Sequence, residues 1–339
     1  MLQPGLSQQR QVLTDRRLLM QPQPNNPLEC EGTLNPAAVR GPDGHLYLFP
    51  RLVGSGNFSR IGICRVLFNE LGEPCGVERL GIALEPEMDY ERNGVGGGGC
   101  EDPRITFVQP LGKFVMTYTA FSSRGPRIAL AVSQDLFTWR RLGLARFRTE
   151  RGLDWGTVRN KDAAFFPSPV LDPAGQPALA MLHRPTFSSS AAEPESIWIS
   201  YRPLEDNLSE FCWHTRLAGP EAAWEAVKIG CGTPPVLTRL GWLLVYHGVR
   251  SDGLGKLIYS AGMMLLQEQD PRCLRYRSPE PVLTPLLPLE RFGTVENVVF
   301  PTGIDRRDDL GCPDRFDVYY GMADSRIGVA RLDLPAGEL

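Results

Sequence analysis

Short apolar runs separated by turn residues recur along the whole chain, a pattern that predicts strands rather than helices. Five times, a polar or glycyl start leads into a short apolar strand, a turn and a second strand. The starts are NPAAV at 35–39, EDPRI at 101–105, KDAAF at 161–165, GTPPV at 232–236 and ENVVF at 296–300. The second strands are LYLFPR, FVMTYTA, LAMLHR, WLLVYHG and DVYYGMAD, which end at Arg51, Ala120, Arg184, Gly248 and Asp324.

This repeat predicts an all-β fold, a five-bladed β-propeller. The second strands end 69, 64, 64 and 76 residues apart, so each unit has room for a four-stranded sheet and one long loop. Outer strands are predicted in RIALAVSQDLFTWRRL and SIWISYRPLEDNLSEFCWHT, and residues 259–266 are predicted as a strand. We therefore predict one propeller domain over residues 30–339. Residues 1–29, rich in Gln and Pro, are predicted as an N-terminal arm, a candidate for contact with a neighbouring subunit in a homo-oligomer.

Composition and charge exclude several classes of function. Of the 339 residues, 42% are hydrophobic and 22% are charged, which is typical of a folded soluble protein. The net charge of -3 gives no basis for binding nucleic acid or an anionic membrane. No apolar run has the length of a membrane span, and the N-terminus lacks the apolar core of a signal peptide, so we expect a cytoplasmic protein. The eight cysteines show no CxxC pair or zinc-site spacing, so we expect no metal site. No feature of the sequence implies a nucleotide cofactor, so we expect no cofactor.

The propeller geometry would bring distant residues together. The innermost strand of each blade lines the central axis, so the starts of the first strands should meet at one mouth of the channel. The residues predicted to converge there are Asn35, Asp102, Lys161, Asp162 and Asn297. Such a polar group around a channel is a candidate binding site by position alone.

The segment 90–104 is the most informative part of this mouth. Four consecutive glycines at 96–99 allow the backbone to approach a ligand, and Glu101 and Asp102 follow shortly after. Cleavage of a glycoside needs a proton for the leaving oxygen, and a carboxyl group whose pKa is raised by a dry site is the usual donor. Asp102 is the candidate for this donor. Glu101 and Arg104 are alternatively a solvated ion pair at a blade edge.

Basic residues on the same strands suit an oxyanion. Guanidinium groups bind phosphate through paired hydrogen bonds and Lys adds a point charge, so phosphorolysis would use such a set. Hydrolysis would instead need a second carboxylate about 6.5 to 9.5 Å from the acid. The basic residues aimed at the mouth are Arg159, Lys161, Arg184, Lys228 and His247, although each taken singly is also typical of a surface or ion-pair residue. Two roles stay open, stacking on sugars or packing between blades, for the aromatic residues Tyr90, Tyr118, Phe165, Tyr201, Tyr246 and Tyr320.

At these residues the chain resembles glycoside hydrolase family 130, the mannoside phosphorylases and β-mannosidases. The matching stretches, over roughly residues 30–333, include NPAAV, EDPRITFV, RNKDAAFFP, MLHRP, KIGCGTPPV, GWLLVYHGV, TVENVVFPTG and YYGMADSRIGVA. The resemblance implies a five-bladed propeller and an inverting reaction on β-mannosides, with Asp102 as the proton donor, directly or through a sugar hydroxyl. The long glycine run before Cys100 departs from the family pattern, in the loop that would shape the acceptor subsite.

The resemblance also implies ligands for phosphate and sugar. Phosphorylase-type members hold inorganic phosphate with two arginines, a lysine and a histidine, which here resemble Arg159, Arg184, Lys228 and His247. Sugar contacts carried over by motif are Asn35, Arg51, Glu101, Arg104, Lys161, Asp162 and Asp324.

The leading hypothesis is an inverting phosphorylase that cleaves β-mannosides with inorganic phosphate to give α-mannose 1-phosphate. Its substrates would be manno-oligosaccharides or β-mannosides of the mannosyl-glucose or mannosyl-GlcNAc type. One alternative is an inverting β-mannosidase of the same family, in which a glutamate such as Glu296 assists water. The other is a propeller that binds sugar without catalysis, because a propeller fold alone does not define an activity.

Overall fold

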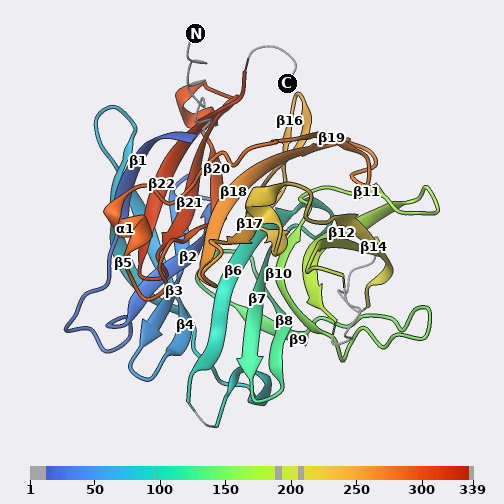
Figure 1. Ribbon diagram of the computed structural model, residues 1–339, viewed down its shortest axis with the longest axis horizontal. Helices are drawn as coiled ribbons and strands as arrows, with labels where there is room; N and C mark the ends of the chain where they lie inside the picture. The colour runs from blue at the N-terminus through green and yellow to red at the C-terminus, as the bar shows by residue number, and fades with distance from the viewer. Residues whose placement is uncertain (1–12, 95, 188–192, 205–209, 336–339) are drawn as a thin grey trace.

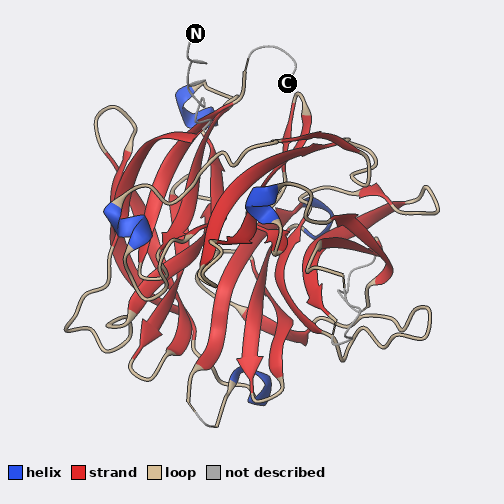
Figure 2. Ribbon diagram, in the orientation of Figure 1, coloured by secondary structure: helices blue, strands red, loops and turns tan. Residues whose placement is uncertain are grey.

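Antiparallel strands form almost all of the regular structure (Figure 2). The computed structural model describes residues 13–94, 96–187, 193–204 and 210–335 (Figure 1). The fold is all-β, as predicted, and its strands form sheets of four, five, five and eight strands. The eight-stranded sheet consists of two successive antiparallel units of four strands, joined by a short parallel pairing of Phe58 and Ser59 with Gly98 and Gly99. Among the described residues, no helix has the length and apolar character needed to cross a membrane.

In each of the first three units the main strands pair with one another in sequence order. The first unit comprises β2 (Gly32–Arg40), β3 (Leu46–Gly54), β4 (Phe58–Phe68) and β5 (Pro74–Leu84). The second comprises β6 (Gly98–Val108), β7 (Lys113–Ser122), β8 (Gly125–Ser133) and β9 (Arg140–Leu144). The third comprises β10 (Arg159–Phe165), β12 (Pro177–Thr186), β13 (Ile197–Pro203) and β14 (Cys212–Ala218), with β11 (Val170–Leu171) beside β12.

The fourth and fifth units complete the fold. The fourth comprises β15 (Lys228–Cys231), β17 (Gly241–Ser251), β18 (Leu257–Leu266) and β19 (Leu274–Arg277), with β16 (Val236–Thr238) beside β17. The fifth comprises β20 (Val299–Arg306), β21 (Arg315–Met322), β22 (Arg326–Asp333) and β1 (Leu13–Met20). β1 lies within the segment predicted as an N-terminal arm, and here it pairs antiparallel with β22 as the outermost strand of the fifth unit. Residues 1–12 of that segment lie outside the described residues.

The predicted second strands are all present, as β3, β7, β12, β17 and β21. The predicted strand at 259–266 is also confirmed, within β18. In the fourth unit the first strand ends at Cys231, so residues 232–235 of the predicted start GTPPV lie between β15 and β16, and only Val236 belongs to a strand. The two prolines of this segment have no N–H group to donate to a neighbouring strand, which accounts for the interruption.

The hydrophobic core lies between neighbouring units rather than in one central mass. Buried side chains form one cluster between each pair of successive units. A further cluster lies between the fifth and first units, where Tyr319 and Val329 pack with Ala38 and Leu48. Near this cluster, Arg40 of β2 pairs with Asp305 of β20 at 2.6 Å. The two ends of the chain's strand series are therefore packed against each other.

Short helical turns precede three of the first strands. They are η1 (Asp89–Glu91), η3 (Ala223–Glu225) and α1 (Pro288–Arg291), while η2 (Gln109–Leu111) and η4 (Asp308–Leu310) lie elsewhere. In the second unit, Glu91 is fully buried and accepts the Tyr118 hydroxyl at 2.6 Å and Arg141 Nε at 2.9 Å. The same Glu, Tyr and Arg arrangement recurs as Glu225, Tyr246 and Arg277 and as Glu290, Tyr320 and Arg16.

These triads tie the loop before a first strand to the second and the outermost strand of its unit. Each glutamate also accepts hydrogen bonds from two backbone N–H groups at or just before its own turn. These hydrogen bonds replace the water that the buried carboxylate has lost. The three tyrosines are thus core residues, and Phe165 and Tyr201 are buried as well. Of the two roles left open for these five aromatic residues, packing in the core is the one observed.

Candidate active site

Polar residues near the beginning of three first strands, and one just before the first strand of the fifth unit, adopt a left-handed backbone conformation. Asn35, Asp102, Asp162 and Asn297 have φ angles of 44°, 46°, 54° and 59°. Asn and Asp tolerate this conformation better than other residues with a side chain. In β2, β6 and β10 the residue lies where the pairing register shifts, so a bulge turns its side chain out of the regular alternation. The Asn or Asp residue that recurs at this position therefore directs its polar side chain away from the face of the sheet.

The predicted donor Asp102 is surrounded by polar groups from three other strands. Its Oδ1 accepts hydrogen bonds from Asn35 Nδ2 at 2.9 Å and from Arg51 at 3.3 Å. Lys161 Nζ lies 4.0 Å from its Oδ2. Arg51 also pairs with Glu101 at 2.9 Å. The structure thus brings these five predicted residues together from β2, β3, β6 and β10.

The charges in this cluster control the protonation of its carboxyl groups. Desolvation raises the pKa of Asp102, but the positive charges of Arg51 and Lys161 outweigh it and hold the pKa below its usual value. The expectation that a dry site raises this pKa is therefore wrong for the unliganded protein. Burial, followed by the charge of Asp102, raises the pKa of Asp324 to about 6. Of these two carboxyl groups, Asp102 is the anion and Asp324 the one that takes up a proton more readily.

A second cluster is centred on Asp162, which is fully buried at the start of β10. Arg184 Nε donates to its Oδ2 at 2.5 Å, and His247 Nε2 lies 3.6 Å from the same atom. Arg104 lies 3.7 Å from Oδ1. Desolvation raises the pKa of Asp162, yet Arg184 and Lys161 hold it far below its usual value. Asp162 is thus a permanent anion around which cationic groups gather.

His247 and Lys228 extend this cluster. His247 is fully buried, and neither of its ring nitrogens has a hydrogen-bond partner among the described residues. Burial lowers the pKa of His247 well below its usual value, so the imidazole is neutral. Desolvation, with the charges of Arg184 and Lys161, lowers the pKa of Lys228 to about 8. Cationic groups beside a buried histidine with unused hydrogen-bonding capacity form a suitable site for an oxyanion.

Arg159 and Arg104 are placed differently from the other predicted ligands. Arg159 is exposed at the start of β10, where its charge acts on Arg127, and among the described residues it makes no hydrogen bond or ion pair with Asp162. Its phosphate contact stays a prediction. Arg104 is 1% exposed, so it is not the solvated residue that the alternative required. Its guanidinium donates to three backbone carbonyls, those of Asp102, Cys231 and Gly232. Arg104 therefore fixes the backbone of the site, and its contact with sugar stays a prediction.

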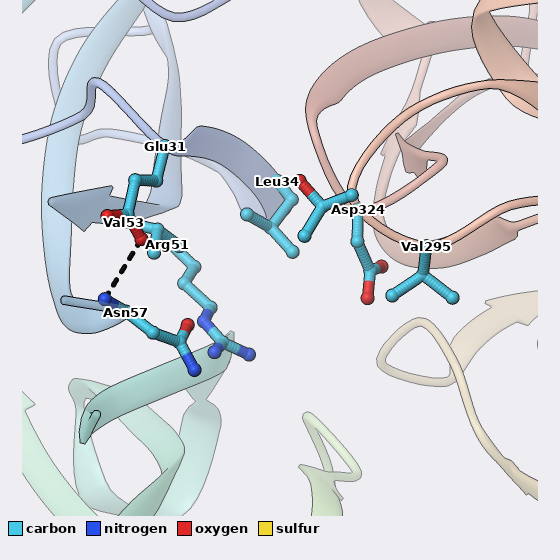
Figure 3. Close-up of a pocket in the computed structure, with 8 residues that line it drawn as sticks. Glu31, Leu34, Arg51, Val53, Asn57, Val295 and Asp324 are labelled. Atoms are coloured by element: carbon cyan, nitrogen blue, oxygen red, sulfur yellow. Dashed lines mark hydrogen bonds between the residues drawn. The ribbon is translucent and has the colours of Figure 1, made fainter. Parts of the chain in front are cut away.

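A pocket of about 450 Å³ opens beside the Asp102 cluster (Figure 3). Arg51 and Asn57 lie on one side of it, and Asp324 and Val295 lie on the other. Its lining comprises Glu31, Leu34, Arg51, Val53, Asn57, Thr294, Val295 and Asp324. The Glu31 carboxylate accepts the backbone N–H groups at 56 and 57, which fixes the turn before β4. Arg51 thus lines the pocket and also donates a hydrogen bond to Asp102, the predicted proton donor.

Sequence reasoning missed parts of this site. Glu31, Asn57 and Thr294 lie outside the repeated strand starts, so no pattern singled them out. Gly230 was also missed, although a Cβ there would lie 2.5 Å from His247 and 2.6 Å from Asp162. The available signal was a glycine inside the short strand KIGC, where a side chain would normally pack.

Two residues predicted near the mouth are placed by the loop before β20. Glu296, the candidate for assisting water, is exposed and pairs with Lys256 at 2.7 Å. The Asn297 backbone bonds with Tyr259 and Arg291, so its carbonyl and N–H are both used within the fold. Neither residue shows a side-chain contact with Asp102 or Asp162 among the described residues.

Similarity to known proteins extends along nearly the whole chain. The model of glycoside hydrolase family 130, described as beta-1,4-mannooligosaccharide phosphorylase, matches residues 15–335. The chain is 32% identical over 329 residues to a 1,2-beta-oligomannan phosphorylase of Thermoanaerobacter sp. (strain X514), covering 95% of this chain and 96% of that one. It is 29% identical over 229 residues to a beta-1,4-mannooligosaccharide phosphorylase of Ruminococcus albus, covering 68% of this chain and 61% of that one.

A solved structure has the same fold. The beta-1,2-mannobiose phosphorylase from Listeria innocua, in complex with beta-1,2-mannobiose, superposes with a TM-score of 0.73. The two chains are 21% identical, and the match covers 93% of this chain and 94% of the other. At this identity the likeness supports the fold.

Proposed function

Because the chain belongs to glycoside hydrolase family 130, we propose that it is an inverting phosphorylase that cleaves β-mannosides with inorganic phosphate to give α-mannose 1-phosphate. The observation that carries this proposal is the pair of adjoining clusters, one around the candidate acid Asp102 and one around Asp162 with Arg184, Lys228 and His247. Lys161 links them, because its charge acts on both aspartates.

The fold proposed for this enzyme is a five-bladed propeller. Successive units contact one another from the first to the fifth, and β20 of the fifth contacts β2 of the first. The hydrophobic clusters follow the same cycle. In such an arrangement the first strands would surround one axis, which accounts for the meeting of residues from β2, β6 and β10.

The positions of the two clusters suit inversion. Arg51, which lines the pocket, donates to Asp102 Oδ1, whereas Lys161 lies near Oδ2 and its charge also acts on Asp162. A mannosyl unit between the two clusters would have its glycosidic oxygen toward the pocket and its anomeric carbon toward phosphate. A phosphate oxygen then forms the new bond to that carbon, the glycosidic bond breaks, and the leaving oxygen takes a proton from Asp102, directly or through a sugar hydroxyl.

Phosphate binding would also prepare Asp102 as an acid. The pKa of Asp102 is held low chiefly by Arg51 and Lys161, against desolvation. A phosphate anion beside Lys161 offsets part of that positive charge, and a bound sugar removes water, so both ligands raise the pKa of Asp102. The carboxyl group is therefore protonated more readily when both substrates are present than when the site holds neither.

The proposed substrates are β-1,2-linked manno-oligosaccharides. A relative that this chain matches over 96% of its length is a 1,2-beta-oligomannan phosphorylase. The pocket supports an extended substrate, because about 450 Å³ can hold more than one sugar unit beyond the scissile bond. The polar side chains of Glu31 and Asn57 would form hydrogen bonds with sugar hydroxyl groups. Leu34 and Val295 would contact the apolar faces of the sugar rings.

A hydrolase is the second candidate, and it is less well supported. Its water would need an activating carboxylate, and the predicted one, Glu296, is exposed and paired with Lys256. The cations around Asp162 would have no role in hydrolysis.

Product analysis separates these activities. We expect β-1,2-mannobiose to be consumed only with phosphate, with α-mannose 1-phosphate identified by its phosphorus and anomeric proton resonances. Equal release of mannose without phosphate would reject phosphorolysis in favour of hydrolysis. Asp102→Asn should lose turnover and still bind phosphate, whereas unchanged turnover would remove Asp102 from the mechanism.

A further inference from the structure

Arg184 is held between two carboxylates, and the second of them has no role in the reaction as proposed. Its Nε donates to Asp162 Oδ2 at 2.5 Å, and its Nη1 forms an ion pair with Glu195. Glu195 lies just before β13, outside the motifs from which the phosphate site was predicted. Its backbone carbonyl accepts the N–H of Ile229, which fixes it beside the strand that carries Lys228.

The two carboxylates hold Arg184 in different ways. The Asp162 side chain is 0% exposed, whereas the Glu195 side chain is 26% exposed. Glu195 Oε1 accepts the Thr186 hydroxyl at 2.9 Å, and its Oε2 is the atom that pairs with Arg184 Nη1. Asp162 therefore holds Arg184 at its Nε from inside the protein, and Glu195 holds it at Nη1 from the partly exposed side. A phosphate ion that accepts two parallel hydrogen bonds from the Arg184 guanidinium group would be a better partner for it than the Glu195 carboxylate.

We propose that Glu195 is an internal competitor of phosphate, a carboxylate that occupies Arg184 until phosphate displaces it. This inference rests on the proposed function and adds a residue that sets phosphate affinity. Asp162 stays in place and orients Arg184, while the partly exposed Glu195 yields its position to phosphate. The negative charge of Glu195 also opposes the incoming anion, so phosphate binds more weakly and leaves more readily than the cations alone would allow.

The test is Glu195→Gln, which removes the charge and keeps the shape. Phosphate affinity, measured by calorimetry with inorganic phosphate, should tighten by about tenfold, and the KM for phosphate should fall by a similar factor. kcat at saturating phosphate should change little, because Glu195 does not touch the reacting atoms. The matched control is Glu193→Gln, since Glu193 lies two residues away and pairs with the half-exposed Arg216, and it should leave both values unchanged.

Thr186→Val gives a second, independent test. It removes the hydroxyl that holds Glu195 Oε1, so it should tighten phosphate binding in the same direction and by less. Weaker or unchanged phosphate binding in Glu195→Gln, with wild-type thermal stability, would overturn the inference and leave Glu195 as a residue that only positions Arg184. If neither the wild type nor Glu195→Gln binds phosphate, the inference and the proposed function both fail. If the wild-type enzyme requires phosphate for turnover, but Glu195→Gln binds phosphate no more tightly than the wild type does, the inference fails and the proposed function stands.

Discussion

Replacing Gly230 with alanine should disable the anion site through a single methyl group. Gly230 lies opposite His247 in the pairing of β15 with β17. A Cβ at this position would lie 2.5 Å from His247 Cε1 and 2.6 Å from both His247 Nε2 and Asp162 Oδ2. An ordinary contact is about 3.4 Å or longer, so these groups must retreat by roughly 0.9 Å. His247 has little room to do so, because its ring lies 4.3 Å from that of Phe300.

The expected loss follows from that displacement. A shift of about 1 Å in a catalytic group can cost on the order of a hundredfold in rate, and overpacking costs roughly 1–3 kcal/mol of stability. We expect Gly230→Ala to lower kcat/KM for phosphorolysis about a hundredfold, with weaker phosphate binding by calorimetry. Gly76→Ala is the matched control, because a Cβ at Gly76 in β5 meets no atom within 4 Å. Activity of Gly230→Ala within twofold of Gly76→Ala would refute the reasoning.

Three further predictions concern stability, pH and the surface. Tyr118→Phe should cost about 1–3 kcal/mol of unfolding free energy in a urea titration, because the fully buried Glu91 loses a hydrogen bond that water does not replace. Tyr47→Phe, whose hydroxyl bonds an exposed carboxylate, should cost less, and equal losses would contradict this account of the triads. Phosphate affinity should fall as the pH rises through about 8, the pKa of Lys228, because Lys228 then loses its charge. Lys228→Arg should make this fall smaller, and an equal fall in both proteins would contradict the assignment of Lys228 as a phosphate ligand. Glu296→Gln should leave the rate of phosphorolysis unchanged, and a large loss would restore Glu296 to the site.

The strand pattern carried much of the fold. The second strand of each unit is an apolar run with a polar end; four of the five runs lie wholly within strands, and the fifth does so as far as Met322. The Asx residues at the bulges were also found, since a polar residue breaking an apolar run is visible locally. β1 was not recognised as part of the fold, because its pairing with β22 joins segments about 310 residues apart and leaves no local signal.

The site was harder to predict where its properties depend on partners far along the chain. Asp102 was expected to have a raised pKa, but Arg51 and Lys161 come from other strands and reverse the shift. The buried glutamates of the triads were missed for the same reason, as each finds its tyrosine and arginine on other strands. Glu195 was missed because a single glutamate before a strand is an ordinary surface residue until Arg184 is seen beside it.

A crystal structure with inorganic phosphate tests the arrangement at the centre of this account most directly. Phosphate should be bound by Arg184, Lys228 and His247, on the side of Lys161 away from the pocket. Asp102 should lie between the bound phosphate and the pocket. Phosphate bound elsewhere, with those three side chains making no contact to it, would contradict the proposed phosphorolysis.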